Sequence, residues 1–341
     1  MRLWMTLLMV ALLTGCAPRP GSDDLHPAPP PPEARVLRVY VVSTRAPDPP
    51  PQIGFGTQPS AMPQYRSYDI AVSHDGPPRV TAWKDLTKAA FLDQTAARSR
   101  GRDGGLGVFV HGFNNTFAES LLNFATLARD GDPGIVPVLF AWPSAGHPLE
   151  YEADRQSALL SRDALAALLD DLTGPGRPQL LVFGHSMGGA LTLEALRTLR
   201  LKGDLRTLNN LKVVLAAPDV DLFMFDRQMR VIGPLVDPMV VLVSPDDRAL
   251  ALSSRLGGGR PRLGAIAANN PGVARAAQRA GVVVLDISAL PADPLNHRRF
   301  EALARYVGAN QTDKPLDLRT AGAFVLNSVD RSLLRPALTG P

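Results

Sequence analysis

Ser186 lies in the segment GHSMGG at residues 184–189, after the apolar run LLVF and before a helical pattern. A turn from a buried strand directly into a helix is the context in which G-x-S-x-G predicts a nucleophilic serine. In so sharp a turn, the residues two before and two after the serine pass close together, and Gly184 and Gly188 are small enough. The following helix directs partial positive charge toward any oxyanion that develops there. We therefore predict a nucleophile elbow with Ser186 at its tip.

A serine hydroxyl is a poor nucleophile until a base takes its proton. Of six histidines, only His297 follows Ser186 by more than a hundred residues, in the loop after the apolar run 282–287. For this type of turn the chain order is serine, acid, histidine. His297 is therefore the predicted general base, and a surface histidine that caps the next helix is the alternative. The histidines expected to be structural or pocket-lining are His111, His147 and His185.

The acid must orient the imidazole and stabilise the imidazolium. Two aspartates, Asp246 and Asp247, come directly after the apolar run VVLVSP at 240–245. Asp247 is the preferred acid and Asp246 the near alternative. Asp219, after the preceding predicted strand, is a third solution. Whichever aspartates are not used are expected to cap helices or face solvent.

An oxyanion hole needs two preorganised N–H donors. The first is expected from the backbone of Met187, the residue after the nucleophile. The second is expected from Phe113, because the segment VFVHGFNN at 108–115 places a His-Gly pair after an apolar run and lets the backbone approach the substrate. Asn114 and Asn115 are expected to brace this loop or cap the helix that begins near Thr116.

Short apolar runs bounded by turn residues alternate with helical patterns from residue 106 onward. Such runs are typical of strands covered on both faces, as in a parallel sheet. The alternation predicts an α/β fold with an open, doubly wound, mostly parallel sheet. The predicted strands are 36–43, 106–110, 137–142, 179–184, 212–217, 239–244 and 281–287.

Three other stretches complete this expectation. Leu165, Leu168, Leu169 and Leu172 repeat along one face of a helix expected within 153–172. The Pro/Gly-rich stretch 47–63 is expected to be a surface loop, and 257–278 an excursion near the site. No large inserted lid is expected between residues 217 and 239. The hydrophobic residues that could line an acyl pocket, but are mostly expected in the core, are Phe113, Trp142, Phe223, Met224 and Phe225.

The first 35 residues have the features of an export and attachment segment. A basic start precedes an apolar run at 3–13, which is too short to span a membrane, and the sequence LTGC ends at Cys16. This resembles a bacterial lipobox, which implies a signal peptide at 1–15 and lipid attachment at Cys16. Residues 16–35 are rich in proline and are expected to form an extended tether. A secretory signal with an incidental cysteine is the alternative.

The composition is that of a folded domain. The 341 residues are 45% hydrophobic and 20% charged, which excludes global disorder. The net charge of +4 comes from arginines spread along the chain, so nothing favours nucleic-acid binding. The single cysteine excludes an internal disulfide framework and a cysteine-based metal site. We expect one domain over 36–341.

The elbow and the segment HGF at 111–113 resemble the α/β-hydrolase superfamily. The segments FVHGFNNTF at 109–117, FAWPS at 140–144, AAPDVD at 216–221, DRAL at 247–250 and TRA at 44–46 are similar to a bacterial family of largely uncharacterised α/β-hydrolases, often lipoproteins or exported proteins. The resemblance implies the α/β-hydrolase fold and a triad of Ser186, Asp247 and His297. It implies no particular substrate.

Together these features predict a serine hydrolase that acts on small carboxylic esters, without a metal or cofactor. We expect it on the exported side of a bacterial membrane, held by a lipid at Cys16. An acyltransferase or amidase with the same triad is one alternative, and a non-catalytic envelope binding protein on a hydrolase scaffold is another. The sequence does not predict an oligomeric state.

Overall fold

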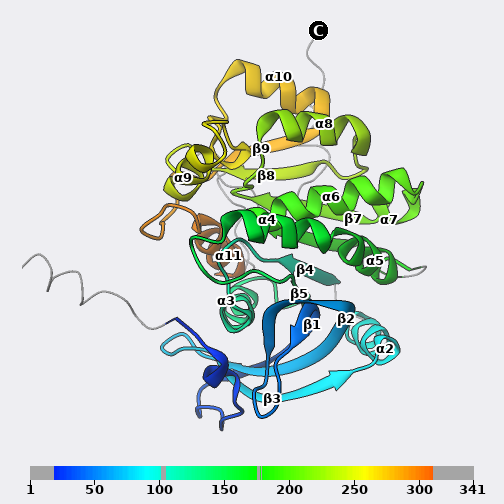
Figure 1. Cartoon of the computed structure of the whole chain (residues 1–341), viewed down its shortest axis with the longest axis vertical. Coiled ribbons are helices and arrows are strands. Elements are labelled where there is room, and N and C mark those ends of the chain that lie inside the picture. Colours follow the sequence, from blue (N-terminus) through cyan, green and yellow to red (C-terminus); the bar gives the residue numbers. More distant parts are fainter. Residues whose placement is uncertain (1–18, 101–104, 175–176, 178, 310–341) are drawn as a thin grey trace, which may run out of the picture.

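The computed structural model describes residues 19–100, 105–174, 177 and 179–309. Within this part of the chain, nine strands form one sheet in the order β3-β2-β1-β5-β4-β6-β7-β8-β9. Helices cover both faces of the sheet (Figure 1). The β1–β2 and β2–β3 pairs are antiparallel and every other pair is parallel. The mostly parallel, doubly wound sheet predicted from the sequence is therefore confirmed.

The parallel strands coincide with the predicted apolar runs. They are β1 (Arg35–Pro47), β4 (Leu106–Val110), β5 (Val136–Ala141), β6 (Leu180–His185), β7 (Leu211–Ala216), β8 (Met239–Val243) and β9 (Val282–Asp286). Successive side chains of a strand point to opposite faces, and both faces are covered here. In β1, Tyr40 and Val42 pack into one core while Val39 and Val41 pack into the other. This explains why the runs are continuously apolar.

The antiparallel edge of the sheet was not predicted. It consists of β2 (Phe55–Val72) and β3 (Arg79–Leu86), so the expected surface loop at 47–63 is wrong from residue 55 onward. The prolines are tolerated there because β3 pairs with β2 only from Tyr65 to Ala71. The earlier part of β2 pairs with β1 only. On its other side no strand needs a hydrogen bond, so a proline without an N–H costs little there. Four residues between Pro59 and Gln64 bulge out of the register with β1.

Two groups of helices form the outer layers. The helices that pack on one core are α2 (Lys88–Ser99), α4 (Tyr151–Leu160), α5 (Arg162–Leu172), α6 (Met187–Leu201), α7 (Leu205–Asn209) and α8 (Leu222–Ile232). Those on the other core are α3 (Phe117–Asp130) and α11 (Arg299–Ala309). The 3₁₀ turn η1 (Ser22–Leu25) packs on the same core. The remaining helical elements are α9 (Arg248–Leu256), η2 (Leu263–Ala265) and α10 (Pro271–Ala280).

The predicted helix within 153–172 is two helices, with a break at Ser161. The Ser161 hydroxyl lies 3.0 Å from the Ser157 carbonyl oxygen and 2.9 Å from the Thr44 hydroxyl of β1. The four leucines of the predicted apolar face are all buried in α5, so that part of the prediction is confirmed.

Part of the segment 257–278 packs on neighbouring loops. Leu263 is buried, its amide donates to the Val220 carbonyl, and the Gly264 carbonyl accepts from the Ser244 amide. The segment therefore ties the loop after β7 to the loop after β8, at the edge where the site lies.

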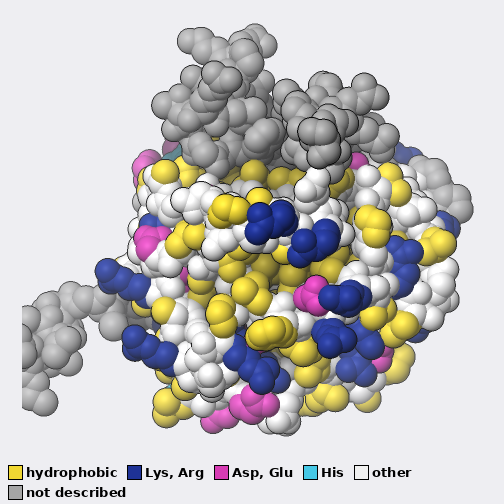
Figure 2. All heavy atoms as spheres, turned by 90° about the horizontal axis from the view of Figure 1, so that it is seen from above, with side chains coloured by type: hydrophobic (Ala, Val, Ile, Leu, Met, Phe, Trp, Pro, Cys, Tyr) yellow, Lys and Arg dark blue, Asp and Glu magenta, His cyan; other side chains and the backbone are white. Residues whose placement is uncertain are grey.

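One end of the molecule carries many cationic side chains. Seen over α8 and α10, Lys and Arg are interspersed with hydrophobic groups, with few acidic groups among them (Figure 2). The exposed arginines of these two helices are Arg227, Arg230, Arg275 and Arg279.

Among the helices that the structure describes, none has the length and hydrophobicity of a transmembrane segment.

Candidate active site

Ser186 occupies a strained position between β6 and α6. Its backbone has φ 54° and ψ −120°, a region that residues with a side chain rarely adopt. The Ser186 amide donates to the Ala216 carbonyl of β7 at 3.0 Å, and the Ser186 carbonyl accepts from Gly189 and Asp219 at 2.9 and 3.1 Å. The neighbouring strand and the loop after it thus hold the turn that carries the hydroxyl.

The two elbow glycines are required by close packing. A Cβ at Gly188 would lie 2.2 Å from the Val110 carbonyl oxygen and 2.4 Å from that of His111. A Cβ at Gly184 would lie 2.7 Å from the Thr192 hydroxyl and 2.9 Å from the Gly188 carbonyl oxygen. The start of α6 therefore touches the end of β4, and only glycine allows that approach.

His297 contacts Asp247 directly. The His297 Nδ1 lies 2.7 Å from the Asp247 Oδ2, and the Asp247 side chain is fully buried. The second carboxylate oxygen accepts from the Leu250 amide at 2.9 Å, as the N-cap of α9. The His297 amide donates to the Asp293 Oδ1 at 2.7 Å. The imidazole is therefore held from its backbone and from one ring nitrogen.

The other two candidate aspartates have different partners. Asp246 forms an ion pair with Arg299, with N–O distances of 2.6 and 2.8 Å, and this pairing lowers the Asp246 pKa to about 2. Asp219 accepts from the hydroxyls of Tyr151 and Ser253 at 2.9 and 2.5 Å. Of the three candidates, Asp247 is the one bonded to His297.

Ser186 and His297 line one cavity of about 500 Å³ at the carboxyl ends of the parallel strands. Phe113, Tyr151 and Asp219 also line it. The cavity thus brings together side chains that follow β4, β6, β7 and β9. Catalytic groups are expected at this edge of an open parallel sheet.

The loop after β4 passes beside the serine. A Cβ at Gly112 would lie 3.1 Å from the Ser186 Cβ, so glycine permits this approach. Met187 is the first residue of α6, and its amide therefore has no acceptor within the helix. Among the described residues, no acceptor is found for the Phe113 amide. In the described part of the chain neither predicted oxyanion donor has an acceptor, and both belong to segments next to Ser186.

A buried carboxylate and a buried guanidinium hold this loop, and neither role was predicted from the sequence. Asp154 accepts from the amides of Asn114 and Ala145 at 3.1 and 2.6 Å, and from the Ser144 hydroxyl at 2.5 Å. Arg45 donates to the carbonyls of Asn115 and Ser144 at 2.8 and 3.0 Å.

The Asn115 side chain braces the loop as predicted, donating to the Phe113 carbonyl at 2.8 Å. Thr116 caps α3, in a capping box with Glu119. Arg45 and Ser144 both lie in segments that carry the family resemblance, which was the available signal for this network. Asp154 had no such signal, because it lies in an ordinary amphipathic helix.

Two of the three histidines expected to be structural or pocket-lining are buried beside the site. Burial lowers the pKa of His111 to about 3, and the ring stacks on Trp142 with centroids 4.8 Å apart. Burial also lowers the pKa of His185, whose ring centroid lies 4.8 Å from that of His297. Both line the cavity, whereas His147 is exposed. The two buried rings are therefore neutral near pH 7 and add no charge beside His297.

The hydrophobic pocket candidates divide between core, cavity and surface. Trp142 is buried in the core and Phe113 lines the cavity. Phe225 is partly buried against the core. Phe223 and Met224 are 73% and 50% exposed, so their expected core positions are wrong. They occupy the first turn of α8, whose buried side is formed later by Gln228, Met229 and Ile232.

No cluster of His, Cys, Asp and Glu that could hold a metal ion is found in the described part of the chain.

A family model described as "Alpha/beta hydrolase of unknown function (DUF900)" matches residues 90–312, more than half of the chain. The chain belongs to this family. No curated protein matches the chain.

Solved hydrolases resemble this α/β hydrolase only distantly. Aspergillus fumigatus lipase B is 13% identical over 51% of this chain, with a TM-score of 0.32, and this chain spans less than half (45%) of the lipase. Esterase Est22 is 14% identical, covers 81% of this chain and 78% of its own, and has a TM-score of 0.39. A Pyrobaculum calidifontis esterase is 14% identical over 89% and 88% of the two chains, with a TM-score of 0.37. At these values the likenesses carry no argument about substrate.

Proposed function

We propose that this α/β hydrolase is a serine esterase, with Ser186 as nucleophile, His297 as general base and Asp247 as the acid that orients it. The 2.7 Å contact between His297 Nδ1 and the buried Asp247 carboxylate carries the proposal, because the same cavity is lined by His297 and the strained Ser186. Bonding through Nδ1 leaves the other ring nitrogen, Nε2, to serve the serine.

In the first half-reaction, Ser186 Oγ attacks the ester carbonyl carbon while His297 Nε2 takes the hydroxyl proton. The Asp247 carboxylate stabilises the imidazolium. The amides of Met187 and Phe113 donate to the oxyanion, and the start of α6 adds partial positive charge. The tetrahedral intermediate collapses, the C–O bond to the alcohol breaks, and His297 returns the proton to the leaving alkoxide. The acyl group remains on Ser186.

In the second half-reaction, water attacks the acyl-enzyme and gives its proton to His297. The bond to Ser186 Oγ breaks, the acid leaves, and the proton returns to the serine. An alcohol or amine in place of water would give acyl transfer through the same steps.

We further propose that the enzyme is attached to the exported side of a bacterial membrane by a lipid at Cys16, on the resemblance of LTGC to a lipobox.

The test is covalent labelling by a fluorophosphonate probe together with turnover of short-chain esters. The wild-type protein should be labelled, and Ser186→Ala should lose both labelling and turnover. Equal labelling of the two proteins would contradict the nucleophile. Absence of labelling and turnover in the wild type would instead favour a binding protein on a hydrolase scaffold. Product analysis with added alcohol acceptors separates hydrolysis from acyl transfer.

A further inference from the structure

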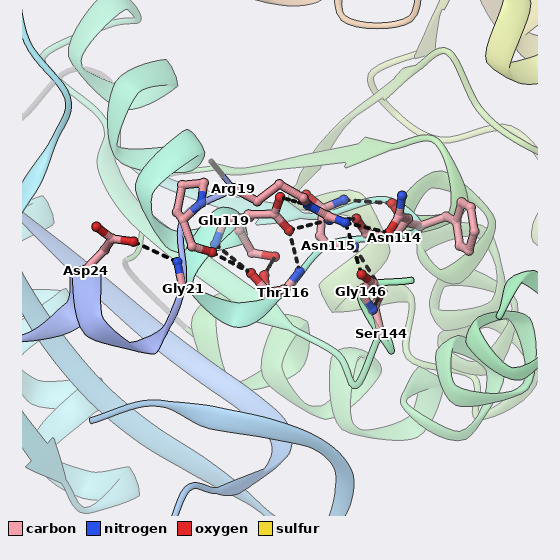
Figure 3. Close-up of polar contacts among 12 residues, drawn as sticks. Arg19, Gly21, Asp24, Asn114, Asn115, Thr116, Glu119, Ser144 and Gly146 are labelled. Carbon is pink, nitrogen blue, oxygen red and sulfur yellow. Dashed lines mark hydrogen bonds and ion pairs between the residues drawn. The ribbon is translucent and has the colours of Figure 1, made fainter. Parts of the chain in front are cut away.

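Arg19 holds the amino-terminal segment against the start of α3 and the loop after β4 (Figure 3). The Arg19 guanidinium forms a bidentate ion pair with Glu119 at the start of α3, with an Nη2–Oε2 distance of 2.6 Å. It also donates to the Asn114 carbonyl at 2.7 Å and to the Gly146 carbonyl at 3.1 Å. Bidentate pairing fixes the direction of the guanidinium as well as its position.

These contacts place the start of the described chain at the site itself. Arg19, Asn114 and Glu119 all line the cavity that contains Ser186. Asn114 directly follows Phe113, the proposed oxyanion donor. The next residue, Pro20, accepts from the Thr116 hydroxyl at 3.3 Å. The described chain therefore begins at the rim of the cavity.

Cys16 comes three residues before Arg19. A residue spans at most about 3.6 Å of extended chain, so the Cα atoms of Cys16 and Arg19 lie within about 11 Å of each other. Residues 16–18 lie outside the described part, and this limit follows from chain length alone. A lipid at Cys16 would therefore hold the cavity rim close to the bilayer surface.

The same rim carries exposed leucines. Leu252, Leu256 and Leu295 line the cavity and are 58%, 61% and 52% exposed. Leu149, next to the cavity-lining Pro148, is 85% exposed. Single exposed leucines need no explanation, but three that line one cavity, with a fourth beside a lining residue in the sequence, form an apolar rim. Leu252 and Leu256 are four residues apart on α9 and so share one face of that helix.

We propose that this leucine rim docks on the lipid bilayer, so that the cavity opens into the membrane surface and receives esters dissolved in it. The substrate part of this inference rests on the proposed esterase function, and the orientation part rests on the attachment at Cys16. A lipid anchor and an apolar contact act together here, and two weak membrane signals give stable binding where one is marginal. The substrate class is a hydrophobic acyl ester within the bilayer.

The orientation is tested without reference to catalysis. Leu256→Cys and Leu201→Cys are matched, because Leu256 and Leu201 are 61% and 62% exposed. Leu201 ends α6, which runs away from Ser186 for 15 residues, about 20 Å. Each variant is purified with its lipid, labelled with an environment-sensitive fluorophore and placed in phosphatidylethanolamine–phosphatidylglycerol vesicles. Wild-type protein labelled in parallel reports any dye attached to Cys16.

The dye at position 256 should shift to shorter wavelength and be quenched by nitroxide-labelled lipids at least about twofold more than the dye at 201. Arg19→Gln should reduce that difference, because it removes the contacts that fix residue 19 at the rim. Equal quenching at the two positions would overturn the proposed orientation, whatever the protein catalyses.

The substrate class is tested by Leu149→Glu against Leu201→Glu. The ratio of turnover on a vesicle-embedded ester to turnover on a water-soluble ester should fall at least about tenfold in Leu149→Glu and stay within about twofold in Leu201→Glu. An unchanged ratio in both would reject membrane esters as substrates. Failure of fluorophosphonate labelling in every protein would instead reject the esterase function and leave the orientation result standing.

Discussion

At the scale of single residues, the site depends on a backbone conformation that Ser186 would not adopt alone. A positive φ at a residue with a side chain costs on the order of 1–3 kcal/mol and persists where the surroundings over-determine it. Here two hydrogen bonds to the Ser186 carbonyl and one from its amide do so. The gain is a hydroxyl that projects at the end of the sheet, with a free helix N-terminus behind it.

The aspartate assignment gives a prediction at this scale. Asp247→Asn should lower kcat/KM for a soluble ester by about two to four orders of magnitude, because an amide neither stabilises the imidazolium nor favours the required tautomer. The measurement is kcat/KM of wild type and variant on the same soluble ester.

Asp246→Asn is the matched control, since it is the same change one residue earlier. It loses an ion pair to Arg299 and no contact to His297, so kcat/KM should change by less than about tenfold. A larger loss in Asp246→Asn than in Asp247→Asn would assign the acid to Asp246 and contradict the proposed triad.

At the scale of elements, the loop after β4 is positioned by groups that do not line the cavity. Asp154 comes from α4 and Arg45 from β1, and both are buried. Burial lowers the pKa of Arg45 to about 10, which leaves it charged near pH 7. Two elements distant in sequence therefore converge on the segment that carries the Phe113 amide.

Asp154→Asn should disturb this loop. An amide can accept through one oxygen only, so at least one of the three donors that Asp154 now satisfies would lose its acceptor, at about 1–3 kcal/mol. We expect chemical denaturation to show a loss of that size. In single-turnover kinetics the acylation rate should fall more than substrate affinity, because the loop acts on the oxyanion.

Asp163→Asn serves as the control, because Asp163 is exposed on α5. It should match the wild type in both measurements. A normal acylation rate in a destabilised Asp154→Asn would mean that Asp154 supports folding without positioning the oxyanion loop.

At the scale of the whole molecule, the two buried neutral histidines couple stability to pH. An unfolded histidine has a pKa near 6.5, while burial lowers the pKa of His111 to about 3 and that of His185 well below its usual value. Between these values the unfolded chain binds protons that the folded chain does not. The free energy of unfolding therefore falls as pH falls below about 6.5, by up to about 1.4 kcal/mol per pH unit for each histidine.

Denaturant titrations at pH 7 and pH 5 measure this slope. We expect a clear loss of stability at pH 5 in the wild type and a smaller loss in His111→Asn, whatever the variant's stability at pH 7. An identical pH dependence in the two proteins would show that His111 is not the group responsible.

The local pattern of apolar residues predicted much of the architecture. Continuous apolar runs identified the parallel strands, because burial on both faces leaves no polar positions in them. The sequence pattern did not predict the start of edge strand β2, because its prolines indicated a loop. Pro59 is tolerated there because that part of β2 has no hydrogen-bonded strand on its outer side. The pattern also failed at Phe223 and Met224, because a hydrophobic residue in a first helical turn is buried only if a neighbour covers it.

The sequence by itself determined the serine turn and the small set of groups that could serve it, since glycine spacing and chain order are local facts. It favoured Asp247 but left Asp219 and Asp246 open, because all three follow strands that end at one edge of the sheet. Only the tertiary structure decided which carboxylate reaches His297, which buried charges hold the loop at Phe113, and that Arg19 fastens the tether at the cavity. Those contacts join residues 40 to 100 positions apart, and such pairings depend on how the crossovers stack, which no local pattern encodes.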